Sequence, residues 1–143
     1  MTKRLSTKAT VYLIDGSNFS RSFWDRRSGG SPDALESEFL DWLDAVSRTE
    51  ALSASCFRVV FDGGFRPTRG RPNQAITVHF SEDGPADDIL LERAFFLASG
   101  GVRCVLVSND REMQAKASAE GASVMSCGSF YRLASCGLEK GGR

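Results

Sequence analysis

The chain has 143 residues, of which 41% are hydrophobic and 25% charged, a balance typical of a globular domain and unlike that of a disordered segment. The 18 basic and 18 acidic residues cancel, so any attraction to nucleic acid or to a membrane has to come from local patches. The polar start is followed by no apolar stretch long enough for a signal peptide or membrane span. We expect a soluble, cytoplasmic protein that forms a single domain over residues 1–143, with a core over about 10–138 and no membrane partner.

The cysteine and histidine content argues against a zinc site. No Cys-x-x-Cys pair occurs, and His79 is the single histidine. We expect free thiols in a reducing compartment and interpret His79 as an ordinary strand residue. The cysteines are Cys56, Cys104, Cys127 and Cys136.

The first half of the chain predicts two strands around one amphipathic helix. Residues 10–14 are β-branched and apolar and run into Asp15-Gly16, which indicates a buried strand followed by a loop. A capping serine, a proline and an aspartate at 31–33 begin a helix over about 33–48, where apolar residues recur at helical spacing. Residues 56–61 form the second strand, which Asp62-Gly63-Gly64 closes.

The second half continues the alternation after a glycine-, proline- and arginine-rich loop at 63–73. Asn109 or Asp110 caps the second of its helices, and glycines end the first two. The expected elements are strands at 75–80, 102–107 and 122–125, and helices at about 86–98, 110–120 and 129–138. Strands that alternate with helices in this way predict an α/β fold with a mainly parallel sheet of about five strands.

Aspartates follow the strands of this sheet. The carboxyl ends of parallel strands lie along one edge, where ligands bind, so acids that are far apart in sequence should converge there. Each aspartate alone has an ordinary explanation as a helix cap or a turn residue. Together they repel one another unless a cation neutralises them, and an all-oxygen site suits magnesium or manganese, as one ion or two. The aspartates are Asp15, Asp62, Asp87, Asp88 and Asp110.

Basic and aromatic residues leave the same edge of the predicted sheet. Arginines around an acidic centre could hold the phosphates of RNA, and aromatic rings among them could stack on unpaired bases. The alternative is that the arginines are solvated surface and the rings pack a short helix. The arginines are Arg21, Arg26, Arg27, Arg66, Arg69 and Arg71, and the aromatic residues are Phe19, Phe23, Trp24 and Phe65.

The ordered motifs resemble a known family. The segment Leu13-Ile14-Asp15-Gly16-Ser17-Asn18 is similar to the Asp-Gly-x-Asn opening of NYN-domain nucleases, in the PIN-like superfamily. The segments around Asp62, Asp87-Asp88 and Ser108–Gln114, with Gly121-Ala122 and Phe130, resemble the YacP branch in order and spacing. Two departures are the Ser108-Asn109-Asp110 triplet, where the family more often has Thr-Ser-Asp, and the glycines after Asp62.

The resemblance implies a three-layer α/β/α sandwich and a metal-dependent endoribonuclease that hydrolyses single-stranded RNA, in some members messenger RNA at the ribosome. It implies Asp15, Asp87 and Asp110 as ligands of Mg²⁺ or Mn²⁺, with Asp62 and Asp88 as supporting catalytic acids. Asn18, Ser108 and Gln114 would shape the site. The sequence leaves open a toxin-like PIN nuclease, a phosphatase with the same metals, a non-catalytic RNA-binding module and a scaffold protein, and it leaves the oligomeric state open.

Overall fold

The computed structural model describes residues 5–24, 32–67 and 73–141. The chain elements in order are β1 (Val11–Asp15), α1 (Gly16–Trp24), α2 (Pro32–Ser47), the short 3-10 helix η1 (Glu50–Leu52), β2 (Cys56–Phe61), β3 (Ile76–Phe80), α3 (Ala86–Ser99), β4 (Cys104–Val107), α4 (Arg111–Ala119), β5 (Ser123–Met125) and α5 (Cys127–Gly141). Arg26, Arg27, Arg69 and Arg71 lie outside the described residues.

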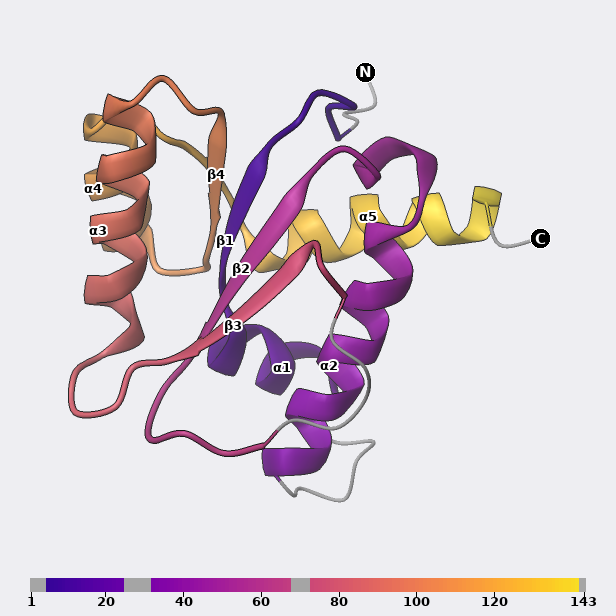
Figure 1. Ribbon diagram of the computed structural model, residues 1–143, viewed down its shortest axis with the longest axis horizontal. Helices are drawn as coiled ribbons and strands as arrows, with labels where there is room; N and C mark the ends of the chain where they lie inside the picture. The colour runs from indigo at the N-terminus through magenta and orange to yellow at the C-terminus, as the bar shows by residue number, and fades with distance from the viewer. Residues whose placement is uncertain (1–4, 25–31, 68–72, 142–143) are drawn as a thin grey trace.

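The strands form one five-stranded sheet in the order β3-β2-β1-β4-β5, and every neighbouring pair is parallel. Helices α3 and α4 lie side by side on one face of the sheet, and α1, α2 and α5 cover the other (Figure 1). This is the predicted α/β/α sandwich with a parallel sheet. Within the described residues, no helix combines the length and apolar character that a membrane crossing requires.

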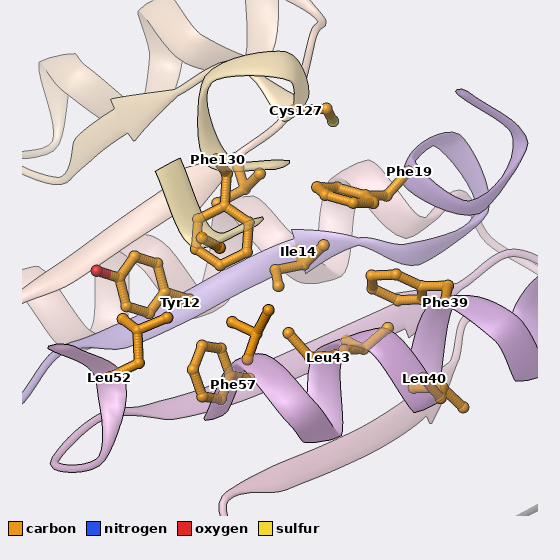
Figure 2. Close-up of a cluster of buried hydrophobic side chains, with 14 of the residues drawn as sticks. Tyr12, Ile14, Phe19, Phe39, Leu40, Leu43, Leu52, Phe57, Cys127 and Phe130 are labelled. Atoms are coloured by element: carbon orange, nitrogen blue, oxygen red, sulfur yellow. The ribbon is translucent and has the colours of Figure 1, made fainter. Parts of the chain in front are cut away.

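Alternation along the strands divides the core into two clusters. In β1, Tyr12 and Ile14 face α1, α2 and α5, whereas Leu13 faces α3 and α4. The first cluster is rich in aromatic rings: Tyr12 stacks on Phe57 with ring centroids 5.4 Å apart and also contacts Phe130 (Figure 2). Burial of these large apolar surfaces on both faces fixes the register of β1 at the centre of the sheet.

Helix α1 is the main departure from the predicted elements, because the residues after Asp15 were expected to form a loop. Phe19 anchors this helix: its ring is fully buried and packs against Phe39 of α2 and Phe130 of α5 (Figure 2). Tertiary packing therefore stabilises a helix whose local sequence resembles a turn. Helix α5 also begins earlier than expected, at Cys127.

Gly16 allows α1 to begin directly after β1. A Cβ atom at this position would lie 2.6 Å from Val59 Cγ1 and 2.7 Å from Phe61 Cε1. Both neighbours are fully buried in β2 and have no free space to move into. The close approach of α1 to β2 thus depends on the missing side chain.

We expect Gly16→Ala to lower the free energy of unfolding by about 1–3 kcal/mol, because the added methyl group overpacks the core. Urea denaturation followed by circular dichroism measures this change. Gly84→Ala is the matched control, since a Cβ at Gly84 meets nothing within 4 Å. Equal losses in the two variants would contradict the explanation.

Candidate functional site

The acidic edge is centred on Asp15, the last residue of the central strand. Its side chain is only 8% exposed, and its Oδ1 accepts a hydrogen bond from the backbone N–H of Asn18 (3.1 Å). Asp15 therefore caps α1 with one oxygen. Within the described residues, its other oxygen makes no hydrogen bond and remains available to a ligand.

Burial raises the pKa of Asp15 to about 6. The loss of solvent is the largest cause, and the negative charges of Asp62 and Asp87 add to it. The Asn18 amide and the positive charge of Arg21 act in the opposite direction. A cation at this edge would offset both the burial and the repulsion.

Asp62 follows β2 and links three elements. Its backbone N–H donates to the buried Oγ of Ser17 (2.9 Å), and its Oδ1 accepts from the N–H of Ala86 (3.0 Å). The carboxylate thus binds the N-terminus of α3, where the helix dipole favours negative charge. These bonds hold the ends of β1 and β2 and the start of α3 in fixed relative positions.

Asp87 and Asp88 lie in the first turn of α3. The pKa of Asp87 is raised by partial burial and then by the charges of Asp110, Asp62, Asp88 and Glu112. Acids from the ends of β2 and β4 and from the starts of α3 and α4 therefore act on the same carboxyl group. Acids distant in sequence therefore lie close enough at this edge to interact electrostatically.

Asp110 is the N-cap of α4, which decides between the two predicted caps. Its Oδ1 accepts from the backbone N–H groups of Glu112 (2.9 Å) and Met113 (3.2 Å). The fully buried Ser108 accepts from the Asp110 N–H (3.1 Å), and Gln114 donates its side-chain amide to the Ser108 carbonyl. Ser108 and Gln114 thus hold the turn that presents Asp110.

Two further residues lie at this edge: Asn109, expected as a possible cap of α4 or a neutral group beside Asp110, and Cys127, which was not predicted as a site residue. Asn109 accepts a hydrogen bond at its side-chain oxygen from the Cys127 N–H (2.9 Å), so it caps α5 rather than α4. The Cys127 thiol lies 4.0 Å from the Asn18 side-chain oxygen, and burial, followed by the Asp15 charge, raises its pKa to about 12. Cys127 is therefore a neutral neighbour of the acids. Its partners lie 18 and 109 positions away, so no local pattern marks it.

The acids fit a hydrated cation better than a closed metal cage. In the described part of the chain, no three acidic, histidine or cysteine side chains are grouped closely enough to form a metal site on their own. Magnesium keeps several waters and needs only one or two direct carboxylates, with the others acting through water. Asp15, Asp87 and Asp110 would supply such oxygens, and the repulsion of Asp87 with each of the other two would favour a cation.

The arginine rim is described only in part. Arg21 is exposed on α1 and acts on Asp15. The guanidinium of Arg66 makes a two-pronged ion pair with the buried carboxylate of Glu36 on α2, through Nε–H to Oε1 (3.0 Å) and Nη2 to Oε2 (2.5 Å). It also lies 4.8 Å from the ring centroid of Phe80. Arg66 therefore anchors the loop after β2, and a contact with RNA stays a prediction.

The predicted stacking residues divide into buried and exposed rings. The prediction is wrong for Phe19, whose ring is fully enclosed by the core. Phe23 stacks on Tyr131 with centroids 4.3 Å apart, and Trp24 is half-buried in the same cluster. Phe65 is 75% exposed at the edge beside Phe80, so it is the one of these predicted rings that is open to a base.

Comparison with solved structures gives close agreement in fold. The crystal structure of Rae1 (YacP) from Bacillus subtilis superposes with a TM-score of 0.67 and 17% sequence identity, and covers 91% of this chain and 76% of that one. A mutant of the same protein gives a TM-score of 0.73 at 16% identity, over 91% of this chain and 77% of that one. At these identities the likeness shows the fold alone.

Comparison with curated protein sequences finds no match. The family model of the YacP-like NYN domain matches residues 12–135, which include all five predicted aspartates and most of both core clusters. The resemblance in the motifs, the parallel fold and this match agree. The chain belongs to the YacP-like NYN domain family.

Proposed function

We propose that this protein is a magnesium- or manganese-dependent endoribonuclease that hydrolyses the phosphodiester bonds of single-stranded RNA. Membership of the family supports a nuclease or RNA-related role in general. The observation that carries the proposal is the electrostatic coupling of Asp15, Asp62, Asp87 and Asp110, which come from separate elements to one edge of the sheet.

The chain's own residues position the reacting groups. Asp15, Asp87 and Asp110 would hold the cation, which when bound supplies charge to activate a water and stabilise the leaving oxygen. Asp62 and Asp88 increase the negative potential that retains it. The backbone N–H of Asn18 binds the carboxylate of Asp15 and keeps it in place. Ser108 accepts from the Asp110 N–H, and Gln114 binds the Ser108 carbonyl, so these two residues keep Asp110 in place.

As part of the same proposal, the protein acts in the cytoplasm on RNA, including messenger RNA on the ribosome. Arg21 is exposed near Asp15 and suits a phosphate, and Phe65 is exposed in the loop after Asp62 and suits an unpaired base. Arg26, Arg69 and Arg71 are candidates for further phosphate contacts. The alternatives are a non-catalytic RNA-binding module of the same fold and a toxin-like PIN nuclease with a narrow target.

We expect Asp15→Asn and Asp110→Asn to lower the rate of RNA cleavage more than about 100-fold, since loss of an outer partner of a metal ligand alone costs about 10- to 100-fold. Asparagine still caps a helix, so each change removes the charge and keeps the capping bonds. A labelled single-stranded oligoribonucleotide in magnesium or manganese, with EDTA as reference, measures the rate.

Asp41→Asn, on an exposed turn of α2, is the control and should cut like the wild type. Equal cutting by all variants and in EDTA would exclude the proposed chemistry. Binding without cutting by the wild type supports the RNA-binding module instead.

The raised pKa of Asp15 predicts a pH-dependent loss of stability in metal-free buffer. At pH values between the ordinary pKa of 3.8 and the raised pKa of about 6, the folded state holds a proton that the unfolded state has released. The protonated carboxyl group of Asp15 therefore contributes its full stabilisation below pH 4. As the pH rises through 6, this contribution of about 3 kcal/mol is lost. We expect Asp15→Asn to remove most of this decline, as measured by urea denaturation at pH 4 to 7.5. If the free energy of unfolding falls with pH to the same extent in the wild type and in Asp15→Asn, the decline does not come from Asp15.

A divalent cation should reverse that loss. We expect manganese at about 100 times its Kd to stabilise the wild type by about 2.7 kcal/mol at pH 7.5, and much less at pH 5, where Asp15 is protonated. Thermal unfolding with and without the ion measures the effect, and Asp15→Asn should respond weakly at both pH values. A wild-type Tm that manganese leaves unchanged at pH 7.5 would contradict the metal requirement.

A further inference from the structure

The edge strand β3 has one face that the helices cover incompletely. β3 pairs with β2 alone, and α3 packs on β1, β2 and β4. On the α3 side, Thr77 is exposed and His79 is half-buried. A strip of the sheet beside α3 therefore faces solvent.

The register places a second basic side chain on this strip. Val60 lies opposite His79 and belongs to the cluster under α3, so its strand neighbour two positions earlier, Arg58, points to the same face. Arg58 lies opposite Thr77. The side chains of Arg58, Thr77 and His79 therefore line one face of the β2–β3 pair.

Helix α3 adds a third basic group. The positive charges that act on His79 come from Arg93 on α3 and from Arg58 on β2; together with burial, the largest cause, they lower its pKa. No carboxylate is among the groups that act on it in the described chain, and neither arginine has an acidic partner within 4 Å there. The cluster is thus positive and unneutralised, although the whole chain has no net charge.

Two nitrogen atoms in this cluster also lack hydrogen bonds. Arg58 Nε and His79 Nε2 are both covered and have no partner among the described residues. Leaving such groups unsatisfied is costly, and buried polar groups are almost always paired in folded proteins. An anionic oxygen that reached either nitrogen would supply the missing partner.

An exposed aromatic ring lies beside the basic groups. Phe96 is 67% exposed and follows Arg93 by three residues, so the two share one face of α3. Phe95, also exposed, points about 160° away from Arg93 around the helix. Only Phe96 of this pair therefore adjoins the basic cluster.

We propose that Arg58, Thr77, His79, Arg93 and Phe96 form a binding surface for single-stranded RNA, here named the β3 patch, in which the basic groups take a backbone phosphate and Phe96 stacks on a base. The inference rests on the proposed function and extends it by assigning part of the path of the substrate. Unpaired cations beside an exposed ring are the combination that single-stranded nucleic acid uses.

The position of the β3 patch suits an RNA strand that leaves the acidic edge. His79 is one residue before the end of β3, and Arg58 is three residues before the end of β2. At about 3.3 Å per residue, the strand residues of the patch lie roughly 3 to 10 Å below the edge. At about 1.5 Å per residue, Phe96 lies roughly 15 Å from the start of α3. An RNA chain held at the aspartates can continue along α3 onto this surface.

Fluorescence anisotropy with a labelled uridine decamer in EDTA tests the patch without cleavage. We expect Arg93→Gln to weaken binding roughly tenfold at low salt and to reduce the salt slope by about 1. Phe96→Ser should weaken binding roughly fivefold or more with the salt slope unchanged. Both side chains are exposed, so the fold tolerates the changes. Arg132→Gln, exposed on α5 in the opposite layer, and Phe95→Ser are matched controls that should bind like the wild type.

His79 gives an independent readout because it is the single histidine of the chain. Its ring signals can be followed by NMR against pH with and without the decamer. A bound phosphate stabilises the imidazolium, so the pKa of His79 should rise on binding and the affinity should increase as the pH falls. An unchanged titration would contradict a phosphate at this position.

Parallel cleavage assays in magnesium separate the two proposals. If Arg93→Gln and Phe96→Ser bind and cut RNA like the wild type, the patch proposal is wrong and the nuclease proposal stands. If the wild type neither binds nor cuts RNA, both are wrong. If the two variants lose affinity for a polyglutamate peptide and keep their affinity for RNA, the surface binds an acidic protein segment and the RNA assignment is overturned.

Discussion

The carboxylate of Asp15 ends the central strand and lies almost wholly out of solvent, where its charge is costly. Gly16 fixes this position, because it lets α1 begin at once and pack closely on β2. The neighbouring acids raise the cost further. The packing that stabilises the core therefore creates an electrostatic strain at its edge, which the proposed cation would relieve.

Helix capping and the acidic edge are two uses of the same side chains. Asp15, Asp62 and Asp110 each accept backbone N–H groups with Oδ1. These bonds restrict the rotamers of the carboxylates and hold them at the edge, while the second oxygen of each makes no hydrogen bond in the described structure. The expected capping role is thus confirmed for Asp110, while Asp15 and Asp62, expected as turn residues, also cap helices. In the proposed function, the same bonds would hold the carboxylates in position for a ligand.

Local patterns in the sequence predicted the strands and the aspartates that follow them, since turn and capping chemistry depends on near neighbours. They indicated a loop after Asp15 and offered a short helix there only as an alternative, because the stability of α1 comes from Phe19 packing on distant helices. They also missed Glu36 as the partner of Arg66, 30 positions away. The role of Asn109 in capping α5 was hidden for the same reason. Contacts of this kind form only in the assembled fold, so no local pattern in the sequence predicts them.

The strand order determines how much of the chain must be synthesised before the sheet can form. β1 pairs with β4, where Val11 lies opposite Cys104, so the centre of the sheet joins segments that are far apart in the sequence. A nascent chain that ends before β4 cannot bring Asp15 and Asp110 together. Strands so far apart in sequence pair late in folding, because the entropy cost of closing the long loop comes before the contacts can stabilise the chain. The proposed hydrolytic centre would therefore form only after the chain through Asp110 has been synthesised and β4 has joined the sheet.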